Sequence, residues 1–333
     1  MHKIYHLASQ LPLSWDKLCQ NNLYLQRSFL TYMEQTNNCG QQYYAFFYKN
    51  KLVGGFVTFE YLSNLLMFTR QFKLNFKIKY IYLPLSVCEP GIFLNQHSQN
   101  EITQTIKSIN GLKVILSTKD NTLLPGLTFA NYLPTSIMNI KWRTFNQYLN
   151  ALRSNYRHRI QKALNKSKNL HIKQLTSNQD FDEQLYSLYC QVWEHAQYKL
   201  EKLNQQFFQL SNSKIFVFYN QKTPLAFVQL IENGQELIFE FGGFDYAKNH
   251  QYDLYYNMLL HIIKYAINHK FKKIDLGQTA EDTKLKLGSH LETRGMFLHH
   301  SNALINWLLK KCVRFIEYSA PTHNFNVFRK VSS

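Results

Sequence analysis

The chain has 333 residues, of which 45% are hydrophobic and 15% aromatic. A chain of this length and apolar content can bury a large core, which excludes an intrinsically disordered protein. The formal net charge of +17 favours anionic partners, such as nucleic acid, phosphorylated small molecules or an anionic membrane surface. The alternative is a basic surface without a specific partner, and the charge alone does not decide between the two.

The cysteines and the apolar runs indicate the compartment. The five cysteines are Cys19, Cys39, Cys88, Cys190 and Cys312. They are scattered along the chain and form no CxxC pair or Cys/His cluster. This pattern predicts neither a disulfide framework nor a metal site. The start of the chain lacks the apolar core of a signal peptide, and no run reaches the ~18 apolar residues of a spanning helix. We therefore expect a cytoplasmic protein, with peripheral contact to the inner face of the membrane left open.

The first half of the chain indicates alternating strands and short helices. Its main signal is a hairpin, YYAFFYK and LVGGFVTFEYL, in which Gly54 and Gly55 indicate a bulge or a close backbone approach. The other predicted elements are a strand at 3–7, helices at 15–19, 29–34 and 100–109, and a strand at 113–117.

The second half begins with helices and continues into strands. The predicted elements are helices at 146–152, 154–168 and 182–196, antiparallel strands at 214–219, 224–232 and 235–241, a strand at 294–299 and a helix at 303–318. The helix at 154–168 carries a basic face opposite its apolar stripe. Arg157 and Lys162 on that face are candidates for binding an anion, and a solvated helix face is the alternative.

Residues 237–290 form the central unit. An apolar strand at 237–241 is followed by a turn-forming polar run at 245–251, and Asp253 then caps a helix with apolar residues at helical spacing from 254 to 266. A short strand at 273–276 ends at Gly277. If this strand is parallel to the first, the loop after it brings Lys284 and Lys286 to the helix start, whose free N–H groups favour an anion.

Two hairpins share one plan. AFFYKNKLVGGFVTFE and IFVFYNQKTPLAFVQLIE place Phe56 and Phe227 at equivalent points, about half the chain apart. A repeat at this period predicts two copies of one domain, which we place at residues 1–143 and 144–333. Chance similarity of two hairpins is the alternative.

Several motifs occur in the order seen in a known family. They are YRHRIQKALNK, YSLYCQVWEHA, TPLAFVQL, FGGFD, LYYNMLLHIIKYAI and FKKIDLGQTAEDTKLKLG, the last with Asp275, Gly277, Lys284 and Gly288. This order resembles the C-terminal domain of the FemAB-like branch of the Gcn5-related N-acyltransferase (GNAT) superfamily. The resemblance implies an α/β (α+β) fold of tandem GNAT-like domains, each a mixed, mostly antiparallel twisted sheet flanked by helices, the first domain degenerate.

The resemblance also implies the reaction. Members transfer an acyl or aminoacyl group to an amine, from acyl-CoA in the wider superfamily and from aminoacyl-tRNA in the peptidoglycan-bridge ligases. The Gly-rich pyrophosphate loop of the superfamily is replaced here by YAKNHQYDLY. We expect an N-acyltransferase with acyl-CoA as co-substrate, no permanently bound cofactor, and an amine of an anionic small molecule or cell-envelope precursor as acceptor. An aminoacyl-tRNA-dependent transferase and a catalytically silent binding protein are the alternatives.

The candidate site residues follow from the unit at 237–290. Glu240, between two phenylalanines, is a candidate base with a raised pKa, or an ion-paired glutamate. Asp275 either orients the acceptor amine or caps the turn at Gly277, and Lys284 is the cation that matches the family motif. The candidates for donor binding are Lys248, Asn249, Tyr252 and Tyr255, and those for anion binding are Arg157, Lys162, Gly277 and Lys286.

The segment LINWLLKKCVRFIEY near the end of the chain is amphipathic and basic. It fits either an anionic membrane surface or a helix that docks its apolar face on the protein.

Overall fold

The computed structural model describes residues 1–66, 68, 75–198, 201–321, 323 and 325–329. The chain divides into two compact units, Met1–Pro134 with Thr293–Ala320, and Thr135–Glu292 with Pro321–Ser333. This differs from the predicted domains, because the segment 293–320 belongs with the first unit. In the described part of the chain, no helix is long and apolar enough to cross a membrane.

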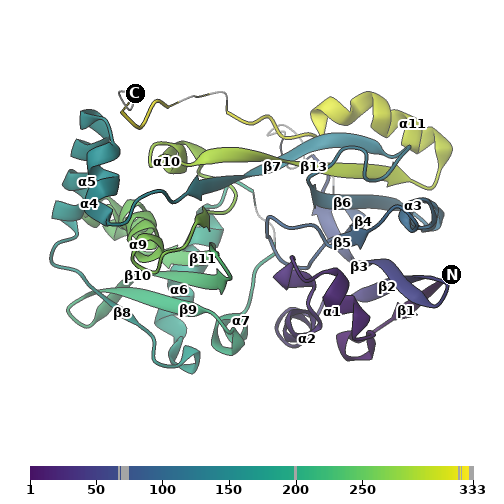
Figure 1. Ribbon diagram of the computed structural model, residues 1–333, viewed down its shortest axis with the longest axis horizontal. Coiled ribbons are helices and arrows are strands. Elements are labelled where there is room, and N and C mark those ends of the chain that lie inside the picture. Colours follow the sequence, from purple (N-terminus) through teal and green to yellow (C-terminus); the bar gives the residue numbers. More distant parts are fainter. Residues whose placement is uncertain (67, 69–74, 199–200, 322, 324, 330–333) are drawn as a thin grey trace. The chain divides into compact units, whose positions relative to one another are not determined.

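The first unit is a mixed sheet with short helices (Figure 1). Its strands are β1 (His2–Tyr5), β2 (Gln42–Tyr48), β3 (Lys51–Asn64), β4 (Asn75–Ile81), β5 (Ile92–Leu94), β6 (Leu112–Thr118) and most of β13 (His290–His300). Its helices are η1 (Ala8–Gln10), α1 (Ser14–Leu18), η2 (Leu23–Leu25), α2 (Arg27–Thr36), α3 (Gln99–Ser108), α11 (Ala303–Cys312) and η4 (Val313–Phe315). The predicted close approach at the glycines is present, since a Cβ on Gly55 would lie 2.4 Å from the Trp15 ring.

The second unit holds the remaining elements. Its strands are the end of β7 (Thr128–Asn139), β8 (His171–Gln174), β9 (Lys214–Asn220), β10 (Thr223–Asn233), β11 (Glu236–Phe244) and β12 (Lys273–Asp275). Its helices are α4 (Phe145–Ala151), α5 (Ser154–Lys166), η3 (Asn178–Asp180), α6 (Glu183–His195), α7 (Gln205–Leu210), α8 (Tyr246–Tyr252), α9 (Leu254–Asn268) and α10 (Glu281–Leu285).

The two units have the same strand plan. The first runs β1-β2-β3-β4-β6-β13 and the second β8-β9-β10-β11-β12-β7. In each unit the fourth and fifth strands, β4 with β6 and β11 with β12, are parallel, and the other neighbours are antiparallel. The fold class predicted from the sequence, a pair of mixed, mostly antiparallel sheets flanked by helices, is therefore confirmed.

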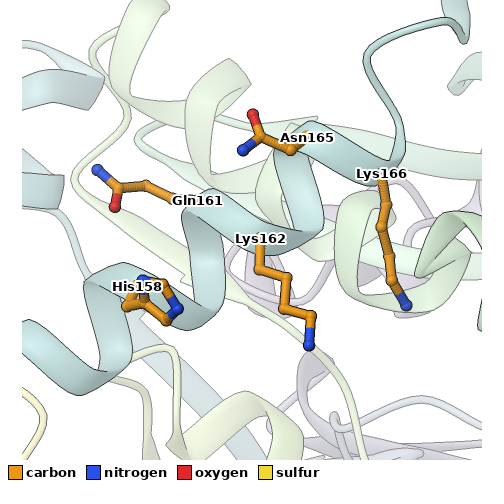
Figure 2. A pocket seen from close by; sticks show the side chains of 5 residues that line it. All are labelled: His158, Gln161, Lys162, Asn165 and Lys166. Atoms are coloured by element: carbon orange, nitrogen blue, oxygen red, sulfur yellow. The ribbon is translucent and has the colours of Figure 1, made fainter.

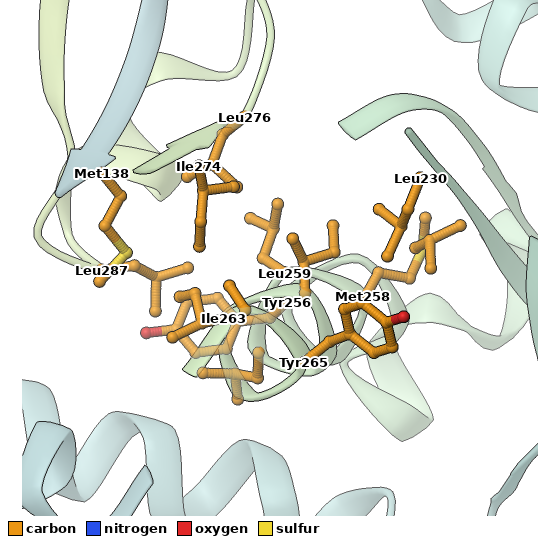
Figure 3. Close-up of a cluster of buried hydrophobic side chains, with 14 of the residues drawn as sticks. Met138, Leu230, Tyr256, Met258, Leu259, Ile263, Tyr265, Ile274, Leu276 and Leu287 are labelled. Carbon is orange, nitrogen blue, oxygen red and sulfur yellow. The ribbon is translucent and has the colours of Figure 1, made fainter. Parts of the chain in front are cut away.

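Helix α9 is the centre of the second unit. Its residues Met258, Leu259 and Ile263 pack with Leu230 of β10 and Ile274 of β12 (Figure 3). Burying each such side chain contributes about 1.5–3 kcal/mol to the stability of the fold. On the other face of the sheet lies α6, because a Cβ on Gly243 would meet its backbone, whereas one on the neighbouring Gly242 would meet Met258.

Two predicted elements differ in the structure. The polar run at 245–251 is a helix, α8, because the Asp245 side chain accepts the Lys248 N–H and caps it. The predicted helix at 303–318 ends at Cys312 and continues as the 3₁₀ turn Val313–Phe315.

Candidate active site

Strands β11 and β12 part after a short parallel pairing. Their register runs from Glu236 opposite Lys273 to Ile238 opposite Asp275, where β12 ends. The chain then follows β7, since the Leu276 N–H donates to the Ser136 carbonyl at 2.9 Å and the Ser136 N–H to the Gly277 carbonyl at 3.0 Å. The edge of β11 that begins at Phe239 therefore has no pairing with β12.

Glu240 is the extra residue of a β-bulge on this stretch of β11. In the ladder Gln229 lies opposite Phe241 and Leu230 opposite Phe239, so Glu240 and Phe241 together oppose Gln229. The Glu240 Oε1 and Gln229 Oε1 atoms are buried and have no hydrogen-bond partner among the described residues. Burial raises the pKa of Glu240 from its ordinary 4.5 to about 8. The bulge thus places two residues with buried acceptor oxygens at neighbouring positions of the ladder.

Asp275 closes the turn that follows β12. Its carboxylate accepts the Thr135 hydroxyl at 2.6 Å and the Gly277 N–H at 2.8 Å, and it is 8% exposed. These contacts show the turn cap, one of the two roles considered from the sequence, and the role of Asp275 toward the acceptor amine stays a prediction.

Lys284 holds the same turn from the other side. Its ammonium group donates to the carbonyls of Gly277 at 3.1 Å and Gln278 at 2.7 Å, and the residue is 2% exposed. The turn is strained, because Thr279 and Ala280 adopt left-handed φ of 60° and 49°, which is unfavourable for residues other than glycine. Lys284 therefore fixes the shape of the loop.

The start of α9 is already occupied by polar side chains. The Asn249 Oδ1 atom accepts the Tyr255 N–H at 3.1 Å. Asp253 has a left-handed φ of 48° and makes no side-chain cap, so the predicted cap is wrong. Its carboxylate instead pairs with Arg159 at 3.0 Å and Lys166 at 3.4 Å. A carboxylate and an amide oxygen thus lie where free N–H groups were expected to receive an anion.

The other predicted donor and anion residues point to different places. The Lys248 side chain is exposed on α8, and the Tyr252 hydroxyl accepts from the Asn220 side chain at 3.2 Å. Burial, with Glu281 nearby, raises the pKa of Tyr255 above its usual range. Lys286 lies 5.0 Å over the Phe325 ring, so it does not join Lys284 at the turn.

The basic face of α5 borders a surface hollow of about 450 Å³. Figure 2 shows the side chains that line it, one helical face made of His158, Gln161, Lys162, Asn165 and Lys166. Lys166 also donates to the His250 carbonyl at 2.7 Å, which ties α5 to the end of α8. Arg157, half-buried on the same helix, is not among the lining residues.

The structure brings Asp275, Gly277 and Lys284 into one turn after β12, and places Glu240 on the neighbouring strand β11, beyond the end of its pairing with β12. Asp245 and Gln229 were not identified from the sequence. An aspartate three residues before Lys248 is a helix-cap signal that would have predicted α8, whereas the bulge that places Gln229 beside Glu240 has no such signal. Among the described residues, no three His, Cys, Asp or Glu side chains gather as metal ligands.

Residues 150–285, from α5 to α10, match the family model of the acetyltransferase (GNAT) domain. The match makes this part of the chain similar to the GNAT acyltransferases. The matched range contains the bulge on β11, the end of the β11–β12 pairing and the strained turn after β12.

Two solved structures share the fold. FemX is 12% identical, with a TM-score of 0.57, over 92% of this chain and 100% of its own. L-PGS from Bacillus licheniformis is 10% identical, with a TM-score of 0.51, over 86% of this chain and 96% of its own. Identities this low establish the fold alone. A search of curated proteins finds no significant match.

Proposed function

We propose that the GNAT domain forms an amide by transferring an aminoacyl group from aminoacyl-tRNA to the amine of an anionic acceptor. The observation that carries the amine acceptor is the pair of buried oxygens on Glu240 and Gln229. Both atoms accept hydrogen bonds, and burying them unpaired costs about 1–3 kcal/mol each. An amine supplies the N–H donors that they lack.

In this proposal the acceptor nitrogen attacks the acyl carbonyl carbon, and the bond to the ribose oxygen of the tRNA breaks as the tetrahedral intermediate collapses. The ribose oxygen leaves as a hydroxyl group with the proton that the amine has lost. Glu240 takes the proton that the amine loses. With a pKa of about 8, Glu240 is a stronger base than an ordinary carboxylate, and the ionised fraction that can take the proton grows as the pH rises toward 8. Asp275 and Lys284 act as positioning residues, since both are bound to the turn at Gly277.

The choice of donor rests on the start of α9. A CoA pyrophosphate would need the N–H groups there, but Asn249 takes that of Tyr255. The Asp253 carboxylate, which already pairs with Arg159 and Lys166, lies at the same helix start. A tRNA is held through its backbone by a basic surface, which α5 offers with Lys162 at its hollow. The net charge of +17 favours the same partner.

Acyl-CoA is the second candidate donor, and the match to an acetyltransferase domain model favours it. In that case Lys248 and the first turn of α8 would contact the donor phosphates.

Binding measurements on the full chain separate the candidates. We expect tRNA to bind with a steep decrease as salt rises, and Lys162→Glu to weaken it more than the control Lys222→Glu, an exposed lysine on the β9–β10 turn. Tight binding of acetyl-CoA without tRNA binding would favour the second candidate. If neither tRNA nor acetyl-CoA binds, the remaining alternative is a catalytically silent binding protein.

The base is tested with a transfer assay once a donor binds. Glu240→Gln is expected to lower the rate by about 10²–10⁴-fold, whereas Glu194→Gln, on the exposed side of α6, leaves it unchanged. An equal effect of both variants would remove Glu240 from the mechanism.

A further inference from the structure

Helix α11 presents an apolar face to solvent. Within Ala303–Cys312 the buried residue is Leu309. The exposed fractions are 67% for Leu304, 55% for Trp307, 46% for Leu308 and 51% for Phe315 just beyond the helix. Leu304 and Leu308 are one helical turn apart and share a side of the helix. The protein therefore leaves this face exposed, whereas a helix that docked through its apolar face would bury it.

Polar contacts hold the helix in place. The Asn302 side chain accepts the N–H groups of Leu304 and Ile305 at 3.0 and 3.1 Å. The Asn306 side chain accepts the His300 N–H at 3.1 Å, and after the helix the Tyr318 N–H donates to the Asn131 carbonyl at 3.0 Å. These contacts hold the start of α11 and the chain after its end, and thereby set which way the helix faces.

The charge beside this face is positive. From residue 303 to 316 the chain has Lys310, Lys311 and Arg314 and no acidic residue. Lys311 lies 5.9 Å from the Trp307 ring and Arg314 5.1 Å from the Phe315 ring. Aromatic rings next to cations are typical of helices that lie at the boundary between lipid headgroups and acyl chains.

We propose that α11 docks this protein on an anionic lipid bilayer, with Trp307 and Leu308 among the headgroups and Lys310, Lys311 and Arg314 on the lipid phosphates. A helix of this length lies in the plane of the interface, since it is too short to span the hydrocarbon core. The proposal concerns the first unit and does not depend on the acyl donor or acceptor of the GNAT domain.

Vesicle sedimentation of the full chain tests the proposal. We expect binding to vesicles of equal parts phosphatidylcholine and phosphatidylglycerol, and at least about tenfold weaker binding to phosphatidylcholine alone, since each cation near the surface contributes about fivefold. A blue shift of tryptophan emission on binding should be lost when Trp307 is changed to Phe. Equal binding to both vesicle types would overturn the role of charge.

Variants separate the apolar face from the charge. Trp307→Ser with Leu308→Ser should abolish binding, whereas Leu13→Ser, at a residue 72% exposed elsewhere in the unit, should not. Lys310→Glu with Lys311→Glu should remove the preference for anionic vesicles, whereas Lys49→Glu with Lys51→Glu, the same charge change on the β2–β3 hairpin, should keep most of it.

Self-association is the competing explanation for an exposed apolar face. If light scattering shows a dimer that Trp307→Ser with Leu308→Ser dissociates, and vesicles do not bind, the face joins two copies and the proposal is wrong. Because no acyl donor is present in these measurements, their outcome is independent of the transfer reaction.

Discussion

The ammonium group of Lys284 lies 2.7 Å from the carbonyl oxygen of Gln278. The same group also donates to the Gly277 carbonyl at 3.1 Å. Between these carbonyls and the helix that carries Lys284, the backbone passes through left-handed conformations at Gly277, Thr279 and Ala280. A buried cation thus stabilises a strained turn at the end of β12.

Lys284→Met tests this relationship, because methionine keeps most of the volume and removes the donors. Both carbonyls would lose a charged donor, while the Gly277 carbonyl keeps the Ser136 N–H, and we expect unfolding in urea to show a loss of about 1.5–3 kcal/mol. Lys286→Met is the control. That ammonium is exposed over the Phe325 ring, so its loss should cost less than about 1 kcal/mol. Equal costs would mean that the turn does not depend on Lys284.

Glu240 predicts a pH dependence of stability. Its pKa is raised by burial from 4.5 to about 8, so the folded state keeps a proton that the unfolded chain loses above pH 4.5. The wild type should therefore lose stability as pH rises from about 4.5 to about 8, by a few kcal/mol in total, since one pKa unit corresponds to about 1.4 kcal/mol.

Glu240→Gln should flatten this part of the pH profile, because glutamine does not ionise. Urea unfolding at pH 5, 6.5 and 8 gives the comparison, with Glu194→Gln on the exposed side of α6 as the control that keeps the wild-type slope. A wild-type profile without a decline over this range would show that Glu240 is hydrated in the folded protein.

The fold was predictable where a regular spacing of apolar residues continues over a whole helix or hairpin. The spacing of apolar residues such as Met258, Leu259 and Ile263 predicted α9, and that helix is present as Leu254–Asn268. The alternating hairpins predicted the repeat, and the two units have the same strand plan. These features depend on residue spacing alone, which the sequence contains in full.

The site was less predictable, because its geometry depends on residues far apart in the chain. Asp253 precedes an apolar helix and resembles a cap, yet its carboxylate pairs with Arg159 and Lys166 of α5. Lys284 fits the family motif of a cation at the reacting centre, yet carbonyls of its own loop surround it. Neither contact follows from local spacing, and the roles of these residues in catalysis stay predictions.

Asp253→Asn tests whether the start of α9 is closed to anions. Asparagine tolerates the left-handed φ of 48°, so the change removes the charge and keeps the backbone. We expect a loss of about 0.5–1 kcal/mol from the partly exposed ion pairs. Phosphate or acetyl-CoA should bind more tightly to the variant, measured by calorimetry, because the repulsion at the helix start is gone. Unchanged affinity would mean that Asp253 does not exclude the pyrophosphate.

Gly243 is expected to fix how closely α6 approaches the strand that carries Glu240. A Cβ there would lie 2.5 Å from the Tyr189 nitrogen and 2.6 Å from the Leu188 carbonyl carbon. Both are backbone atoms, so Gly243→Ala requires the helix to move, and we expect urea unfolding to show a loss of about 1–3 kcal/mol or more.

The control is Gly234→Asn on the β10–β11 turn, where no atom lies within 4 Å of the added Cβ and φ is +60°. Asparagine accepts this conformation, so its cost should stay below about 1 kcal/mol. If α6 moves in Gly243→Ala, the packing around the β-bulge at Glu240 changes, and the transfer rate should fall together with the stability of the protein. A variant as stable and as active as the wild type would show that α6 adapts to the methyl group, and that the bulge does not depend on this approach.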